Sequence, residues 1–261
     1  MAKKKRLDVM VYERGLAPSR SKAQAYIMAG EVFVDEERVD KVGSKFTEDV
    51  DIRVKSRPPY VSRGGEKLAG ALEDFAFNPA GMICADVGAS TGGFTDCLLQ
   101  HDAKRVYAID VGYGQLAHKL RVDERVVVME RTNARYVEAL DERVSLVVVD
   151  ASFISLRLLL PAIQLWLDET ADIIALIKPQ FEAGKSEIGK GGVVKDEDVH
   201  DRVIREVADY ANENALIIRG LTISPIKGLN KGNTEFLIWL ANYGDSTFDL
   251  DSAITDVLAQ V

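Results

Sequence analysis

The fold is decided by the segment Met82-Ile-Cys-Ala-Asp-Val-Gly-Ala-Ser-Thr-Gly-Gly-Phe-Thr95, which joins an apolar run to a glycine-rich loop and then to a helix-length segment. The apolar run Met82–Val87 predicts a buried strand. Gly88, Gly92 and Gly93 allow the backbone to come close to a ligand. The free N–H groups at the start of the following helix favour a carboxylate or a phosphate. This strand–loop–helix turn therefore predicts a ligand site.

The same alternation of apolar runs and helix-length segments continues along most of the chain. Helix-length segments lie at Thr91–Gln100, Ile154–Trp166 and Asp196–Asn212. Repeated strand–helix units predict an α/β fold with a doubly wound, mostly parallel seven-stranded sheet, whose ligand sites lie at the carboxyl ends of the strands. The seven apolar runs are Met82–Val87, Arg105–Ile109, Val126–Met129, Leu146–Val149, Ile173–Ile177, Leu216–Ile223 and Glu235–Leu240.

The first 55 residues predict a smaller α+β domain. Apolar residues recur at helical spacing from Arg6 to Arg14, and Gly15 ends that helix. Ser19 is placed to cap a second helix that runs to about Met28. The other predicted features are a strand at Glu31–Asp35, a turn at Asp35–Arg38, a strand at Asp51–Val54 and a proline-rich boundary at Ser56–Tyr60.

Composition excludes several classes of protein. The 261 residues are 47% hydrophobic, enough for a sizeable core, yet the longest apolar runs are far too short to span a bilayer. The basic start of the chain runs into a mixed segment and predicts no signal peptide. Two cysteines, Cys84 and Cys97, cannot form a disulfide framework, so a cytoplasmic location is expected. The three histidines are scattered, and no Cys/His spacing predicts a zinc site.

The charge is distributed unevenly along the chain. The formal net charge is −8, but residues 1–67 carry 15 basic against 11 acidic residues, and the remainder carries 18 against 30. A basic N-terminal part on an acidic body indicates that the N-terminal part meets a polyanion.

Ionisable side chains stand at the ends of several apolar strands. Asp110 ends the second strand, 24 residues after Asp86, where a carboxylate can accept hydrogen bonds from both hydroxyls of a ribose. Buried charges at such positions are costly unless they are paired or used in chemistry. Four candidates for chemistry lie on four separate segments: Lys67, Asp150, Lys178 and Glu235.

Several motifs of the chain resemble those of one known family. One loop, Asp86-Val-Gly-Ala-Ser-Thr-Gly-Gly93, resembles motif I of class I methyltransferases, which holds S-adenosylmethionine. The loop lacks the G-x-G step that a nicotinamide dehydrogenase would have. The K-D-K-E tetrad of FtsJ-type ribose 2′-O-methyltransferases is similar to the four candidates in their order. The S-four RNA-binding domain resembles Arg14-Gly-Leu-Ala-Pro-Ser-Arg20-Ser-Lys22 and its surroundings. With Ser62-Arg-Gly-Gly-Glu-Lys67 and Lys178-Pro-Gln-Phe-Glu182, the combination resembles the TlyA family.

The resemblance implies a class I (Rossmann-like) methyltransferase that methylates the ribose 2′-hydroxyl of a cytidine in ribosomal RNA. S-adenosyl-L-methionine is the implied cofactor, and ribosomal RNA or ribosomal subunits are the implied partners, with no metal and no membrane. The linker Arg57–Tyr60 departs from the R-A-W-V form of the family. The implied domains are residues 1–58 (S-four type), 59–63 (linker), 64–245 (methyltransferase) and 246–261 (acidic C-terminal helix).

The resemblance also implies roles for individual residues. Methyl transfer is an in-line displacement that needs alignment and removal of the hydroxyl proton. Lys178 is the expected general base. Lys67 is expected to favour the neutral form of Lys178, while Asp150 and Glu235 orient the two ammonium groups. The expected cofactor-binding residues are Asp86, Gly88, Ser90, Thr91, Gly92, Gly93, Phe94, Asp110 and Asn133. The expected RNA-binding residues are Lys3, Lys4, Lys5, Arg6, Arg14, Arg20, Lys22 and Arg63.

Two other interpretations remain open from the sequence alone. A catalytically inactive RNA-binding protein would share both domains, and a cofactor-binding titration distinguishes it from an enzyme. A hemolysin or cytolysin is suggested only by the label that many members of the family carry. That activity needs a membrane-active segment, and the sequence contains neither a long apolar helix nor a basic amphipathic helix with a clean apolar face.

Overall fold

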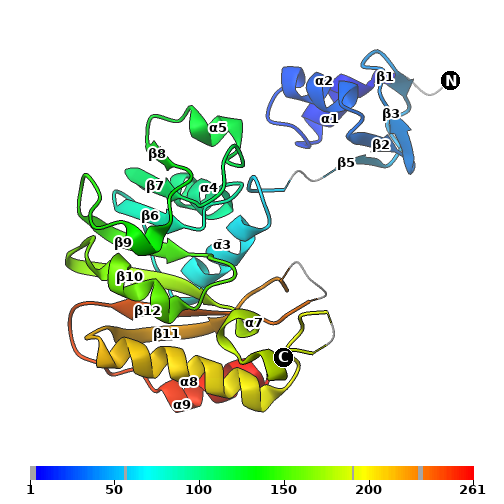
Figure 1. The fold of residues 1–261 in the computed structure, drawn as a ribbon. Helices are drawn as coiled ribbons and strands as arrows, with labels where there is room; N and C mark the ends of the chain where they lie inside the picture. Colours follow the sequence, from blue (N-terminus) through cyan, green and yellow to red (C-terminus); the bar gives the residue numbers. More distant parts are fainter. Residues whose placement is uncertain (1–3, 56–57, 190, 229–231) are drawn as a thin grey trace. The chain divides into compact units, whose positions relative to one another are not determined.

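The computed structural model describes residues 4–55, 58–189, 191–228 and 232–261. The chain forms two compact units, residues 1–57 and 58–261, each with its own core (Figure 1). In the described parts of both, no helix is long and apolar enough to cross a membrane.

The first unit packs two helices against small antiparallel sheets. Ser19 caps the second helix by accepting a hydrogen bond from the Lys22 backbone N–H, as predicted. The expected turn at Asp35–Arg38 is shorter than predicted, because only Asp35 and Glu36 adopt positive φ and the next strand begins directly after them. The elements are β1 (Lys5–Arg6), α1 (Leu7–Glu13), α2 (Arg20–Met28), β2 (Val32–Val34), β3 (Glu37–Val39), β4 (Lys45–Phe46) and β5 (Ile52–Val54).

The second unit is built on a seven-stranded sheet with the strand order β11-β12-β10-β9-β6-β7-β8. Four neighbouring pairs are parallel, and only β12 runs antiparallel to its neighbours β10 and β11. The predicted doubly wound, mostly parallel sheet is thereby confirmed. The strands are β6 (Ile83–Val87), β7 (Arg105–Ile109), β8 (Val126–Met129), β9 (Val144–Val149), β10 (Leu167–Ile177), β11 (Ile217–Ile223) and β12 (Phe236–Ala241).

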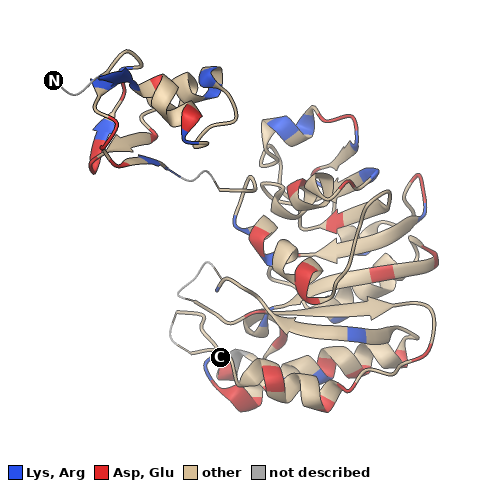
Figure 2. Ribbon diagram, turned by 180° about the vertical axis from the view of Figure 1, so that it is seen from behind, with Lys and Arg blue, Asp and Glu red and all other residues tan. Residues whose placement is uncertain are grey.

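Helices cover both faces of this sheet. One apolar core contains residues of α3 (Gly64–Asp74), α4 (Gly93–Gln100) and α5 (His118–Arg121), and the other contains residues of α6 (Leu160–Gln164), α8 (Glu197–Glu213) and α9 (Leu250–Leu258). The short elements are α7 (Pro179–Glu182) and the 3₁₀ helices η1 (Ala134–Tyr136), η2 (Leu156–Leu158) and η3 (Lys185–Glu187). Acidic residues outnumber basic ones on α8 and α9 (Figure 2).

Two predicted elements of the second unit also differ from the structure. The single helix expected at Ile154–Trp166 is divided into η2 and α6, because Pro161 lacks an N–H group and occupies the first turn of a new helix. The strand expected at Ile173–Ile177 is longer, since β10 begins at Leu167.

The sheet order also explains where a ligand site can form. The chain runs from β6 to β7 and β8 on one side and returns to β9 on the other side of β6. This reversal leaves a crevice at the carboxyl ends of β6 and β9, the usual ligand position in open α/β sheets.

Candidate active site

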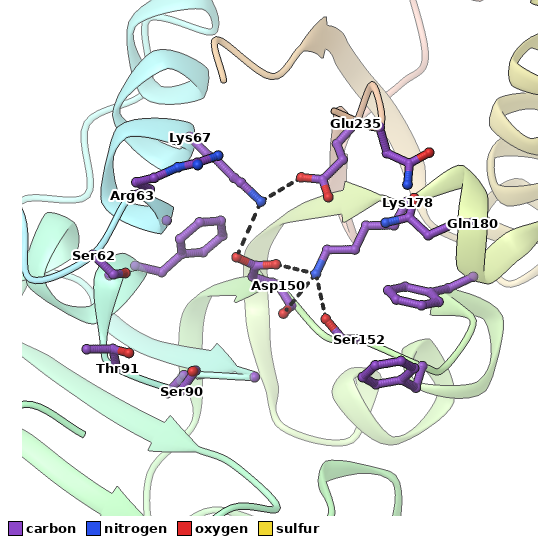
Figure 3. Close-up of a pocket in the computed structure, with 18 of the residues that line it drawn as sticks. Ser62, Arg63, Lys67, Ser90, Thr91, Asp150, Ser152, Lys178, Gln180 and Glu235 are labelled. Atoms are coloured by element: carbon purple, nitrogen blue, oxygen red, sulfur yellow. Dashed lines mark hydrogen bonds and ion pairs between the residues drawn. The ribbon is translucent and has the colours of Figure 1, made fainter. Parts of the chain in front are cut away.

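A cavity of about 760 Å³ lies at the carboxyl ends of β6, β9 and β10 and the start of β12 (Figure 3). Its lining includes all four residues predicted to carry chemistry, which come from segments far apart in the chain. Lys67 lies on α3, Asp150 follows β9, Lys178 follows β10, and Glu235 directly precedes β12.

The four residues form a continuous chain of ion pairs. Lys67 Nζ lies 2.5 Å from Glu235 Oε2 and 3.9 Å from Asp150 Oδ2. Lys178 Nζ lies 2.5 Å from Asp150 Oδ1, so this carboxylate is shared between two lysines. Lys67, Lys178 and Glu235 are all less than one-tenth exposed. The structure therefore brings together the four residues that the sequence singled out.

Lys178 also meets groups that sequence reasoning missed. Its Nζ donates to Ser152 Oγ at 3.0 Å and to the backbone carbonyl of Asp150 at 3.3 Å, in addition to its ion pair. An ammonium group has three N–H donors, and three acceptors surround this one. The arrangement fits the protonated form of Lys178. Ser152 is visible in the sequence only as a residue two positions after a strand-end aspartate.

Two aromatic side chains line the cavity beside Lys178. Phe153 is 88% exposed and has a φ of 64°, an unusual conformation for a bulky residue that suggests backbone strain at this site. Its ring lies 4.9 Å from the ring of Phe181, measured between centroids. Phe181 in turn lies 5.9 Å from Lys178 Nζ. Nothing in the local sequence marks these two residues as an exposed aromatic pair.

A buried carboxylate links the segment after β9, which carries Phe153, to helix α7, which carries Phe181. Glu182 accepts hydrogen bonds from Ser155 Oγ at 2.6 Å and from the Leu156 backbone N–H at 2.8 Å. Burial raises the pKa of Glu182, and the two hydrogen bonds oppose that shift. The segment after β9 is thus held to the segment after β10.

The glycine-rich loop after β6 forms another part of the cavity lining. Asp86 is fully buried and accepts hydrogen bonds from the Thr95 backbone N–H and hydroxyl, both through Oδ2. Its Oδ1 has no partner among the residues that the structure describes. At Gly88, with a φ of 86°, an added Cβ would stand 2.8 Å from the Asp150 carbonyl oxygen. A buried acceptor without a partner, and a position at Gly88 that admits no side chain, fit the amino-acid part of S-adenosylmethionine.

The predicted cofactor residues do not all line the cavity. Asp86, Gly88, Ser90, Thr91, Gly93 and Phe94 do so. Asp110 lies outside the lining, where it accepts hydrogen bonds from the Ser90 N–H at 2.7 Å and the Gly112 N–H at 2.6 Å. Gly92 and Asn133 also lie outside it. Gly92, with a φ of 97°, leaves room for Leu120, and the exposed Asn133 caps η1.

Burial of Asp86 makes stability depend on pH. Burial raises the pKa of Asp86 to about 7; the hydrogen bond from Thr95 opposes the shift and the charge of Asp150 adds to it. In the unfolded chain an aspartate ionises near pH 4, so between about pH 4 and about pH 7 only the folded protein keeps this proton. This group therefore makes the free energy of unfolding fall as pH rises through that window.

Asp86→Asn is expected to remove this contribution, because an amide does not ionise. Urea denaturation of the ligand-free protein at about pH 5 and about pH 8 should show a smaller loss of stability in the variant than in the wild type. The exposed Asp209→Asn on α8 is the matched control and should keep the wild-type pH dependence. An unchanged pH dependence in Asp86→Asn would show that Asp86 is ionised throughout.

The predicted RNA-binding residues of the first unit differ in how they are held. Arg6 and Arg20 both contact Asp8, and Lys5 forms an ion pair with Glu13. Arg14 donates to the backbone carbonyls of Val50 at 2.8 Å and Glu48 at 2.7 Å. Lys4 and Lys22 are exposed, while Lys3 lies outside the described residues.

The remaining residue predicted to bind RNA belongs to the second unit. Arg63 lines the cavity and donates to the Lys227 carbonyl at 2.6 Å. In the described part of the chain, no group of three or more His, Cys, Asp or Glu side chains is arranged to hold a metal ion.

Comparison with known proteins gives two domain matches and several full-length relatives. Residues 60–242 match the FtsJ-like methyltransferase family, and residues 5–52 match the S4 domain. The chain is 47% identical over 249 residues to the Mycobacterium tuberculosis "16S/23S rRNA (cytidine-2'-O)-methyltransferase TlyA", covering 94% of this chain and 92% of the relative. It is 44% identical over 235 residues to "Hemolysin A" of Brachyspira hyodysenteriae, covering 89% and 98%. A solved structure, "Putative hemolysin from Streptococcus thermophilus", superposes with a TM-score of 0.75 at 43% identity, covering 100% of this chain and 96% of that one.

Proposed function

Because this chain belongs to the FtsJ-like methyltransferase family, and within it to the TlyA family, we propose that it methylates the ribose 2′-hydroxyl of a cytidine in ribosomal RNA. The family resemblance and the methyltransferase activity that the motifs predicted are confirmed, and the fold implies S-adenosylmethionine as the cofactor. The observation that carries the proposal is the ion-pair chain Glu235–Lys67–Asp150–Lys178 beside the glycine-rich loop.

The loop after β6 is proposed to hold the cofactor. Asp86 Oδ1 is available for the cofactor's ammonium group, and the backbone from Gly88 to Gly93 surrounds its amino-acid part. Asp110 is proposed to bind the ribose hydroxyls while its hydrogen bonds to Ser90 and Gly112 order the loop. When bound, S-adenosylmethionine supplies a methyl group already activated by the positive charge on sulfur.

Lys178 is proposed to remove the proton from the ribose 2′-oxygen. Its Nζ lies at the cavity surface beside the exposed Ser152, within reach of a hydroxyl that enters the cavity. A base must be neutral before it accepts a proton, so the proton held by Asp150 and Ser152 must first leave. Asp150 is shared with Lys67, so two cations lie against one carboxylate beside the proposed base. Glu235 and Asp150 then orient Lys67 and Lys178.

Phe153 and Phe181 support a nucleotide substrate rather than a small molecule. A base buried in folded RNA must leave its stack before the ribose beside it can enter a cavity. Exposed aromatic side chains provide a surface on which such a base can lie. This pair borders Lys178, where the ribose has to be placed.

The two units are proposed to divide the work. Residues 1–58 supply affinity for RNA through basic side chains that contact phosphates, and residues 64–245 supply cofactor binding and chemistry, joined by residues 59–63. Residues 246–261 contribute α9, whose Ile254 and Val257 are buried in the core of the second unit.

The proposal is tested by methyl transfer from radiolabelled S-adenosylmethionine to ribosomal subunits that lack the modification. The expected product is RNA with a 2′-O-methylated cytidine, located by mass spectrometry of nuclease fragments. Label on a base, or cofactor binding without any methylation of either subunit, would contradict the proposed function. The second outcome would instead support a catalytically inactive RNA-binding protein.

Asp110→Ala is expected to weaken S-adenosylmethionine binding at least tenfold, about 1.4 kcal/mol, because the variant loses both the ribose contact and the bonds that order the loop. Calorimetric titration measures this change. Asp123→Ala is the control, since that carboxylate pairs with Arg125 away from the cavity. Unchanged affinity in Asp110→Ala would remove Asp110 from the cofactor site.

A further inference from the structure

One buried carboxylate of the first unit has no role in the function proposed above. The side chain of Asp8, on α1, is 0% exposed, yet three polar side chains converge on it. Arg6 donates from Nε to Oδ1 at 2.9 Å and from Nη2 to Oδ2 at 3.3 Å. Arg20 donates from Nε to Oδ2 at 2.9 Å, and Gln24 donates from Nε2 to the same oxygen at 2.7 Å.

These contacts keep Asp8 ionised. Burial by itself would raise the pKa of Asp8, but hydrogen bonds from Arg6, Gln24 and Arg20 hold it well below its usual range. A buried charge is tolerated only when it is paired in this way. The two arginines, by contrast, remain about half exposed, at 43% and 51% of their side-chain surface. The cluster thus combines a buried anion with two cations that reach solvent.

The geometry leaves part of each guanidinium available. A guanidinium group carries five N–H donors in a fixed plane. Asp8 takes the Nε side of both Arg6 and Arg20, and no other acceptor in the described parts of the chain bonds either group. The other N–H donors of Arg6 and Arg20 are therefore available, while one carboxylate holds both guanidinium groups. Their planes are constrained before any ligand arrives.

We propose that Asp8 is a positioning residue for RNA binding, which holds Arg6 and Arg20 together so that their free N–H groups receive a backbone phosphate. Arginine binds phosphate best through paired N–H groups in its plane. Holding two flexible side chains in the bound conformation lowers the entropy lost on binding. The proposal rests on the proposed RNA binding by this unit. It assigns a role in that binding to Asp8, although the negative charge of Asp8 by itself repels RNA.

That opposing charge makes a sharp test possible. Asp8→Asn removes a negative charge next to two arginines, so electrostatics alone predicts tighter RNA binding. If Asp8 positions the two arginines, Asp8→Asn should instead weaken RNA binding. The amide of asparagine offers one acceptor oxygen in place of two and carries no charge, so it holds the arginines less firmly. We expect the affinity of the full-length variant for ribosomal RNA transcripts to fall by on the order of fivefold or more, measured by filter binding over a KCl series.

Glu13→Gln is the matched control. Glu13 is an exposed carboxylate of the same helix that pairs with Lys5, so its removal changes the charge of the unit by the same amount. The control is expected to bind RNA as tightly as the wild type, or more tightly. Equal or tighter binding by Asp8→Asn would overturn the proposal. No RNA binding by the wild type would refute the proposed function itself, together with this inference.

A double-mutant cycle separates positioning from a purely structural role. In a protein that already carries Arg6→Ala and Arg20→Ala, the further change Asp8→Asn should have little effect on RNA affinity. A structural role would leave the fivefold loss in place, and that result would also overturn the proposal. If Asp8→Asn does not fold, Gln24→Ala takes its place in the cycle, because it removes one partner of Asp8 without changing the charge. Affinity for S-adenosylmethionine should stay unchanged in every variant.

Discussion

Lys178→Arg is expected to lower the single-turnover rate of methyl transfer by on the order of 10²–10⁴-fold while S-adenosylmethionine still binds. Arginine stays protonated at any working pH and cannot accept the ribose proton. The substitution keeps the positive charge next to Asp150, so the ion-pair chain retains its charge balance. Rapid-quench assays with ribosomal subunits measure the rate, and calorimetry measures cofactor affinity.

Two further variants show whether the loss of rate comes from the loss of a base at residue 178. Lys178→Ala should be about as inactive as Lys178→Arg, because both lack a base. Lys119→Arg is the matched control, since Lys119 pairs with Asp96 outside the cavity and should tolerate the change. If Lys178→Arg kept more than about a tenth of the wild-type rate, Lys178 would be an electrostatic or structural residue. The role of base would then pass to Lys67 or be abandoned.

Deletion of residues 1–58 is expected to abolish methylation of ribosomal RNA while cofactor binding stays nearly intact. The second unit has its own core and contains every residue that lines the cavity, so its chemistry does not need the first unit to form. The first unit is proposed to supply the contacts to phosphate, which contribute much of the affinity for RNA. Calorimetry and methyl-transfer assays measure the two properties separately.

A salt series with the full-length protein provides the control for this deletion. Binding of ribosomal RNA should weaken steeply as salt concentration rises, as expected for contacts to phosphate. The isolated second unit should show weak binding at every salt concentration. Methylation by the truncated protein at the full-length rate would show that the first unit is not the RNA-binding module.

Much of the fold was predictable because its signals are local. Alternation of apolar runs with helix-length segments predicted the seven-stranded sheet, and the loop from Asp86 to Phe94, expected to form a ligand site, lines the cavity. Ser19 capped α2 as its side chain suggested. The errors were also local. Pro161 divided a predicted helix, and two positive φ angles shortened a predicted turn.

The contacts within the site were less predictable, because they join residues far apart in the chain. Ser152 and Glu182 are ordinary polar residues in the sequence, and only the adjacent ends of β9 and β10 bring them to their partners. Asp110 and Asn133 were expected beside the cofactor from their positions after β7 and β8. The structure places both outside the cavity lining, where each accepts hydrogen bonds from backbone N–H groups.

The sequence by itself determined the fold class, the glycine-rich loop and the four residues of the ion-pair chain, since residue type and spacing along one strand or loop suffice for these. The tertiary structure alone decided which lysine meets which carboxylate, and that Asp8 pairs with both Arg6 and Arg20. The physical reason is the order of strands. Because β10 lies between β9 and β12, the residues that follow β9 and β10 and the residue that precedes β12 meet at one edge of the sheet. Hydrogen bonding between strands sets that order, and no single segment encodes it.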